Sequence, residues 1–293
     1  MLIIPAEQVP SAAIQNFLMP HEKMCVQLSS YVRKNRTDLY VIEDNDDEIC
    51  GVIYAKGTFL HCIPDFSAHA AELTQVLGNF LLTHPVKCIN GELTVSESLK
   101  ALAQSSQGTG GSQQNQSTQG VVSQPQTNRY KLMCLTPGDQ LLPPSEPLQP
   151  CDEIRRLANP DHDAEIIFDL QKHYIMEEVA PAGKTPGDLE INVILKQILK
   201  NQLCLTLFSD GEPVAKANTN AIGWKRVQLG GVYTNPLYRR NGYACQLVYN
   251  LCSRILRTGR TVTLYVKEKN TPALELYKKL GFKECGSYSI TYF

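Results

Sequence analysis

The second half of the sequence alternates between short apolar runs and segments with helical periodicity, and this alternation limits the possible folds more than any other feature. Runs bounded by turn residues predict strands at residues 152–157, 203–208, 213–218, 227–234, 262–266 and 287–293. Apolar residues at helical spacing predict helices at residues 160–179, 189–200, 242–258 and 272–280. The resulting order, β-α-α-β-β-β-α-β-α-β, predicts an α/β (α+β) fold with a mixed sheet and helices on both faces.

The first half is predicted to form a smaller α/β domain. Strand-like runs at residues 40–43 and 50–54 flank an acidic turn at residues 44–48. Residues 96–103 are compatible with a short helix and residues 128–136 with a strand. No group of residues in this half forms a pattern that carries chemistry.

Two stretches of unusual composition interrupt the chain. Residues 105–128 are rich in Gln, Ser, Gly, Thr and Asn and have almost no apolar content, which predicts a disordered loop. Residues 141–150, with the sequence LLPPSEPLQP, predict a semi-extended linker. We therefore expect an N-terminal domain at residues 1–140, a Pro-rich linker at residues 141–150 and a second domain at residues 151–293.

The composition excludes several classes of protein. The 28 Lys and Arg residues nearly balance the 29 Asp and Glu residues, so the net charge gives no reason to expect nucleic acid or a membrane as a partner. No apolar run reaches the roughly 20 residues that span a bilayer, and the N-terminus lacks the basic region of a signal peptide. We expect a cytoplasmic protein.

The histidines and cysteines do not indicate a metal site. The six histidines are not clustered and form no pair with ligand spacing, so no metal is expected. The ten cysteines are scattered singly, without a Cys-x-x-Cys pair. We interpret them as reduced thiols, many of them in the core.

A strand-turn-helix segment at residues 231–244 is the first candidate site. Gly242 permits a positive φ and close approach of the backbone, and Ala244 leaves space at the start of the helix. Free N–H groups in the first turn of a helix attract anions, and Arg239 and Arg240 would strengthen that attraction. The segment fits a pyrophosphate, although an ordinary capping turn would also explain it.

The charge distribution agrees with an anionic ligand. From Arg226 to the end there are eleven basic and three acidic residues, in a chain that is nearly neutral as a whole. Such a concentration of positive charge predicts a polyanionic partner. A solvated basic face remains the alternative.

A second candidate segment extends from Asn270 to Phe282. Asn270 is predicted at the point where a strand ends and Pro272 begins a helix, where its amide can contact a ligand. Tyr277 lies further along this helix between apolar neighbours, so it is either a core residue or a functional phenol.

Together the two segments resemble the GCN5-related N-acetyltransferase (GNAT) superfamily. Residues 232–244, VYTNPLYRRNGYA, resemble the family's fourth strand and its Q/R-x-x-G-x-G/A pyrophosphate loop. The C-terminal motif N-x-x-A-x-x-x-Y-x-x-L-G-F is matched by Asn270, Ala273, Tyr277, Leu280, Gly281 and Phe282. The resemblance covers residues 152–293. Fused members of the superfamily exist, so the N-terminal domain is a candidate for a degenerate GNAT-like copy.

The resemblance implies an acetyltransferase that uses acetyl-CoA as co-substrate, with the amine attacking directly in a ternary complex. The acceptor would be the primary amine of a small molecule or a protein. Strands 227–234 and 262–266 would diverge around the pantetheine arm, and Tyr277 would be the general acid that protonates the CoA thiolate. The cofactor-binding residues implied are Val232, Tyr233, Thr234, Arg239, Arg240, Asn241, Gly242, Tyr243, Ala244 and Asn270.

One family feature is missing. Many members carry a glutamate on or near the fourth strand as general base, but residues 227–234 contain no carboxylate. Glu177 and Glu178 are the candidate bases, whereas His173 is interpreted as a surface or packing residue. The alternative function is a non-catalytic acyl-CoA-binding or sensing module.

Overall fold

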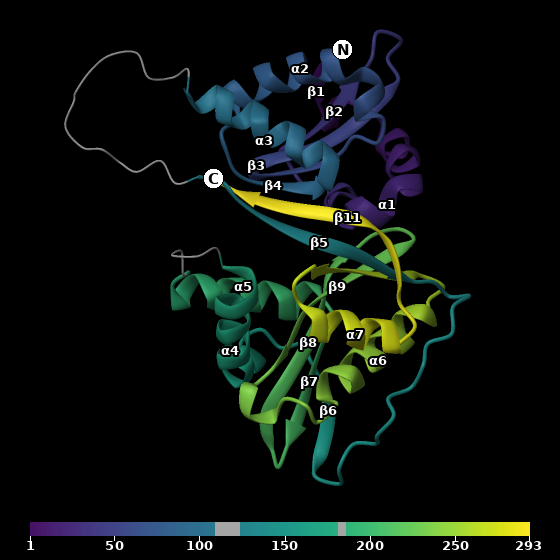
Figure 1. Cartoon of the computed structure of the whole chain (residues 1–293), viewed down its shortest axis with the longest axis vertical. Helices are drawn as coiled ribbons and strands as arrows, with labels where there is room; N and C mark the ends of the chain where they lie inside the picture. The colour runs from purple at the N-terminus through teal and green to yellow at the C-terminus, as the bar shows by residue number, and fades with distance from the viewer. Residues whose placement is uncertain (109–123, 181–185) are drawn as a thin grey trace, which may run out of the picture. The chain divides into compact units, whose positions relative to one another are not determined.

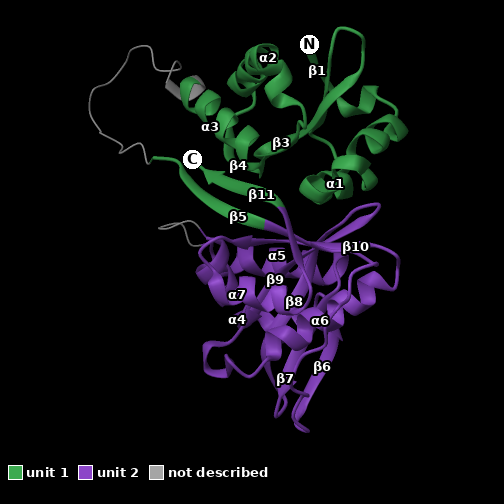
Figure 2. Cartoon of the chain, turned by 45° about the vertical axis from the view of Figure 1, so that its right-hand side comes forward, with its two compact units in different colours: residues 1–131, 286–293 green, residues 132–285 purple. Residues whose placement is uncertain are grey.

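The computed structural model describes residues 1–108, 124–180 and 186–293. The chain divides into two compact units (Figure 2). The first unit consists of Met1–Lys131 and Gly286–Phe293, and the second of Leu132–Cys285. The Pro-rich segment expected as a linker, residues 141–150, lies within the second unit. Most of the segment predicted to be disordered, residues 109–123, lies outside the described residues.

The first unit contains a mixed sheet. Its strands are β1 (Leu2–Pro5), β2 (Leu39–Glu43), β3 (Ile49–Cys62), β4 (Val86–Glu92), the first part of β5 (Gln126–Leu135) and the end of β11 (Lys283–Tyr292). The pairs β1–β2, β2–β3 and β4–β11 are antiparallel, and β3–β4 is parallel. The α-helices among the described residues of this unit are α1 (Ser11–Arg33), α2 (Ala70–Thr83) and α3 (Leu93–Gly108).

The last residues of the chain form a strand of this sheet. Strand β11 lies beside β4 (Figure 1), with Tyr288 opposite Glu92 and Tyr292 opposite Cys88. The backbone N–H of Phe293 also donates to the carbonyl of Lys87. Residues 286–293 are therefore a structural part of the first unit, although the whole second unit separates them from the rest of it in sequence.

The second unit contains the predicted alternation of strands and helices. Its strands are β6 (Asp152–Leu157), β7 (Cys204–Ser209), β8 (Glu212–Ile222), β9 (Arg226–Thr234) and β10 (Thr261–Lys267). They lie in the order β6-β7-β8-β9-β10. The first three pairs are antiparallel and β9–β10 is parallel. The mixed α/β class is thus confirmed.

Helices pack on both faces of this sheet because side chains alternate along its strands. On one face, α4 (Asp163–Tyr174) and α5 (Asp188–Asn201) share a buried cluster with Cys204. On the other, α6 (Tyr243–Leu256) and α7 (Thr271–Lys279) share a second cluster with Leu205 and Leu207. A single π-helical turn, η3 (Ile175–Val179), extends α4. No described helix is long and apolar enough to cross a membrane.

Strands β9 and β10 form a ladder over only part of their length. The ladder extends from the pair Thr261 and Arg226 to the pair Leu264 and Leu229. The ends of both strands, residues 230–234 and 265–267, lie beyond this ladder. In the same region β9 contains a bulge. Lys216 faces Tyr233 and Asn218 faces Gly230, so Gly231 and Val232 together oppose the single residue Ala217.

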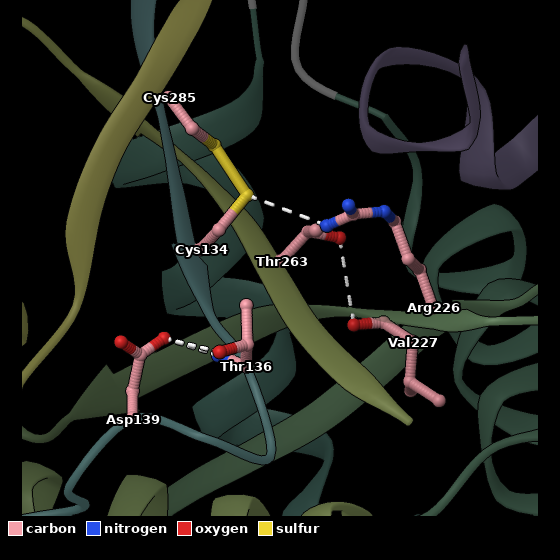
Figure 3. Close-up of a disulfide and its surroundings, with 7 residues drawn as sticks. All are labelled: Cys134, Thr136, Asp139, Arg226, Val227, Thr263 and Cys285. Atoms are coloured by element: carbon pink, nitrogen blue, oxygen red, sulfur yellow. Dashed lines mark hydrogen bonds between the residues drawn. A yellow bond between two sulfur atoms is a disulfide. The ribbon is translucent and has the colours of Figure 1, made fainter. Parts of the chain in front are cut away.

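Two cysteines form a disulfide within the second unit. Cys134, in β5 (Gln126–Leu135), is bonded to Cys285 in β11 (Figure 3). A guanidinium nitrogen of Arg226 lies 3.7 Å from the Cys134 sulfur. The expectation that all cysteines are reduced thiols is therefore wrong for this pair, whose members are 151 residues apart in sequence.

Candidate functional site

The turn between β9 and α6 has an unusual backbone conformation. Arg240 and Gly242 both have positive φ, of 71° and 73°. Asn235 caps the preceding short turn by accepting a hydrogen bond from the Leu237 N–H at 3.1 Å. A Cβ built on Gly242 would have no neighbouring atom within 4 Å. The first N–H groups of the 14-residue helix α6 therefore follow an open, left-handed glycine, which leaves room for an anion to approach them.

Arg239 is already engaged by neighbouring groups. Its Nε donates to the carbonyl of Thr234 at 3.1 Å, and its guanidinium lies 5.6 Å from the centroid of the Tyr233 ring. Its Nη2 donates to both carboxylate oxygens of Glu177, at 2.8 and 2.9 Å. The hydrogen bond with Arg239 lowers the pKa of Glu177. Arg239, which is predicted to bind the pyrophosphate, is thus hydrogen-bonded to Glu177, a candidate general base.

The other predicted residues of the turn lie in different environments. Asn241 is exposed, and its amide donates to the Tyr238 carbonyl at 3.3 Å. The side chain of Tyr243 is buried and its hydroxyl donates to Asp152 at 3.2 Å, on β6. Only the backbone of Tyr243 can therefore contribute to an anion site.

Asn270 caps α7. Its Oδ1 accepts a hydrogen bond from the Ala273 N–H at 3.2 Å, and its Nδ2 donates to Glu178 at 3.3 Å. Glu178 also lies 3.3 Å from the ammonium of Lys267, at the end of β10. The two glutamates of η3 thus contact different segments. Glu177 binds Arg239, which follows β9. Glu178 contacts Lys267 at the end of β10 and Asn270 at the start of α7.

Tyr277 is buried in the core cluster on the α6–α7 face, with 7% of its surface exposed. Its ring packs against Phe282 at a centroid distance of 5.7 Å. Burial raises its pKa, and the nearby Tyr174, Cys252 and Glu178 contribute to the increase. The phenol therefore stays protonated at neutral pH, which is compatible with a general acid and equally with a core residue. His173 is exposed on α4.

A buried lysine that none of the sequence motifs contains lies beside the bulge. Lys216, on β8, is fully buried, and its Nζ donates to Asn218 Oδ1 and to the Gly231 carbonyl, both at 2.9 Å. Nζ also lies 5.1 Å from the centroid of the Tyr174 ring. The Tyr174 hydroxyl accepts a hydrogen bond from the Gly231 N–H at 3.3 Å. A charged residue in the middle of an alanine-flanked strand, Val-Ala-Lys-Ala, was the available signal.

Comparison with known proteins assigns a fold to this arrangement. Residues 212–290 match the model of the family described as FR47-like protein. A Drosophila protein structure aligns with 100% of this chain and 98% of its own, with a TM-score of 0.70 and 17% identity. A GCN5-related N-acetyltransferase from Sphaerobacter thermophilus aligns with 99% of this chain and 96% of its own, with a TM-score of 0.58 and 15% identity. The chain has the GNAT fold.

The GNAT fold extends to the first unit. A tandem GNAT protein from the clavulanic acid biosynthesis pathway covers 99% of this chain and 97% of its own, with a TM-score of 0.58 and 10% identity. The match therefore includes both units, and the expectation of a GNAT-like N-terminal domain is confirmed. None of the curated proteins compared with the chain matches it in sequence. No group of three or more residues that could hold a metal occurs among the residues that the structure describes.

Proposed function

We propose that the second unit is an N-acyltransferase that moves an acetyl group from acetyl-CoA to a primary amine. The observation that carries the proposal is the open, left-handed Gly242 at the start of α6, the helix that follows β9, whose ladder with β10 ends at Leu229. The N–H groups of residues 239–244 would bind the pyrophosphate, assisted by the Arg239 and Arg240 side chains. The backbone of residues 232–234 would pair with the pantetheine arm, and Asn270 would lie at its side.

The reaction needs two proton transfers. The amine nitrogen attacks the thioester carbonyl, the carbon–sulfur bond breaks, and the electron pair leaves on the CoA sulfur. Tyr277 would give its phenolic proton to this thiolate, and its raised pKa means that the phenol is protonated before this step. The proton lost by the amine would go to a carboxylate, with Glu177 and Glu178 as the candidates. Glu177 would first have to leave Arg239.

A non-catalytic acyl-CoA sensor is the second candidate, and two contacts favour it. Tyr277 packs as a core residue, and the side chain of Asn270 is used as a helix cap. A sensor would bind acetyl-CoA but release no CoA thiol with any amine. Turnover therefore separates the two functions.

A cytoplasmic location of the protein remains a prediction.

Calorimetric titration with acetyl-CoA tests the binding site. We expect Gly242→Glu to weaken binding at least about tenfold, because the carboxylate would repel the pyrophosphate. Gly259→Glu is the matched control: Gly259 has a φ of 74° and equally open surroundings, so it introduces the same charge and backbone strain elsewhere. Equal binding by both variants would mean that the turn is not the site. No binding by the native protein would reject the proposed function.

A further inference from the structure

The Lys216 ammonium is hydrogen-bonded to a peptide group inside the β9 bulge. That peptide group joins Gly231 to Val232: its oxygen accepts from Lys216 Nζ, and its N–H belongs to Val232. In the proposed acetyltransferase the backbone of residues 232–234 binds the acyl-CoA, and the N–H of Val232, inside the bulge, would be the donor that faces its acyl carbonyl. The lysine and the acyl group would therefore lie at opposite ends of one peptide unit.

We propose that Lys216 is a positioning residue that polarises the acyl carbonyl of bound acetyl-CoA through the Gly231–Val232 peptide group. The inference rests on the proposed acyltransferase function and deepens it. Lys216 touches neither substrate nor cofactor in this arrangement. It acts through the backbone, both by fixing the bulge and by changing the electron distribution of one amide.

The physical basis is the resonance of the peptide bond. A cationic donor on the carbonyl oxygen draws electron density from the amide nitrogen and makes its N–H a stronger donor. When an amine attacks the thioester, an electron pair moves onto the acyl oxygen, where the Val232 N–H would stabilise it. The pair returns as the carbon–sulfur bond breaks. Lys216 keeps its protons throughout.

The surroundings of Lys216 are specialised for holding a charge in this position. Burying an ammonium is costly unless several groups solvate it, and here two oxygens and the Tyr174 ring do so. Both oxygens belong to neutral groups, so the positive charge is not cancelled by a carboxylate at that point. Gly231, with a φ of 58°, is required as well, because a Cβ there would lie 2.0 Å from Asn218 Oδ1.

Vibrational spectroscopy can test the polarisation without knowledge of the acceptor. Acetyl-CoA labelled with carbon-13 at the thioester carbonyl is bound to the full chain, and the isotope-edited carbonyl stretch is compared with that of free acetyl-CoA. We expect a lower frequency in the native complex. In Lys216→Met we expect most of this shift to be lost while the dissociation constant changes by less than about threefold. Lys200→Met, at an exposed lysine of α5, should retain the full shift.

A second measurement needs no substitution and covers the case in which Lys216→Met does not fold. Burial lowers the pKa of Lys216 to about 8. Raising the pH from about 7 to about 9.5 should therefore neutralise the lysine and return the carbonyl frequency of the native complex toward the free value.

The groups that face Lys216 should not titrate in the same range. Burial raises the pKa of Cys204 on β7, Tyr174 on α4 and Tyr233 on β9. Asp163 on α4, which acts on Cys204, has a lowered pKa and stays charged. The α5 side chains in this cluster, Leu195 and Leu199, carry no ionisable group.

The outcomes separate this inference from the proposed function. The role of Lys216 would be overturned if the carbonyl frequency of bound acetyl-CoA were the same in the native protein and in Lys216→Met. It would also be overturned if this frequency did not change between the two pH values. In both cases the binding of acetyl-CoA would stand. A native complex without any shift would also overturn the role of Lys216. If the native protein does not bind acetyl-CoA, the proposed function fails, and this inference fails with it.

Discussion

Glu177 and Arg239 form a two-pronged ion pair, in which one guanidinium nitrogen lies 2.8 and 2.9 Å from the two carboxylate oxygens. Arg239 precedes the left-handed turn at the start of α6. An incoming pyrophosphate would therefore meet an arginine that already has an anionic partner. In the proposed enzyme, binding of the cofactor would replace one anion by another and release the carboxylate.

This competition predicts that Glu177→Gln binds acetyl-CoA more tightly than the native protein. Exposed ion pairs contribute at most about 1 kcal/mol, so the expected gain is about 2- to 5-fold in the dissociation constant. Calorimetric titration measures it. Glu190→Gln, on the exposed surface of α5, is the control for loss of one negative charge. Weaker binding by Glu177→Gln would show that the pair supports the site rather than competing with the ligand.

Tyr277→Phe removes one hydroxyl and keeps the ring that packs against Phe282. If the phenol is the general acid, we expect turnover to fall by about 10² or more, with acetyl-CoA affinity nearly unchanged. Release of free CoA thiol with an accepted amine provides the rate. Tyr249→Phe, a half-buried tyrosine of α6, should retain full turnover. Undiminished turnover in Tyr277→Phe would leave the residue a purely structural role.

The buried Lys216 predicts a pH dependence of stability. Its pKa is lowered from 10.5 to about 8, so between these values the unfolded chain binds more protons than the folded one. Folded-state stability should therefore rise with pH across this window, by up to about 3 kcal/mol, and this gain should be lost as the pH falls through 8.

Urea unfolding of the native protein and Lys216→Met at about pH 7.5, 9 and 10.5 checks this dependence. The native protein should gain stability relative to the variant as the pH increases. Lys200→Met should remain parallel to the native protein at all three pH values. A native-to-variant difference that does not change with pH would contradict the burial of a charged lysine.

The Cys134–Cys285 bond closes a loop of 151 residues in sequence. Under oxidising conditions we expect Cys285→Ser to lower the free energy of unfolding by about 2–4 kcal/mol, because the open chain has more conformational entropy when unfolded. With reductant present, native protein and variant should become equal. Cys151→Ser, at an exposed free cysteine, is the control. A native stability that is insensitive to reductant would mean that the bond does not form.

The sequence was most informative where periodicity is local. The predicted strand at residues 227–234 and helix at residues 242–258 correspond closely to β9 and α6. Helix α1 was missed because it contains Pro20 and a non-helical backbone at Cys25, which interrupt the apolar pattern. Propensity and spacing thus describe regular elements well and interrupted ones poorly.

The features of the candidate site also differ in whether the sequence could predict them. The left-handed turn at Gly242 could be predicted from sequence because a glycine before a helix is a local signal, whereas the role of this glycine in binding remains a prediction. The contact of Lys216 with Gly231 depends on a shift of register between two strands, and no single-residue preference reveals such a shift. The disulfide has the same character, since only the folded chain brings its cysteines together.

The place of β11 in the first unit determines when that unit can be finished during synthesis. A ribosome makes β4 early and residues 286–293 only after the whole second unit has been made. Until then, the sheet of the nascent first unit lacks β11, and the backbone groups along one edge of β4 are unpaired. An unpaired edge of this kind favours pairing with other chains, which a chaperone can prevent. A fragment that ends in the Pro-rich segment would keep this edge permanently open.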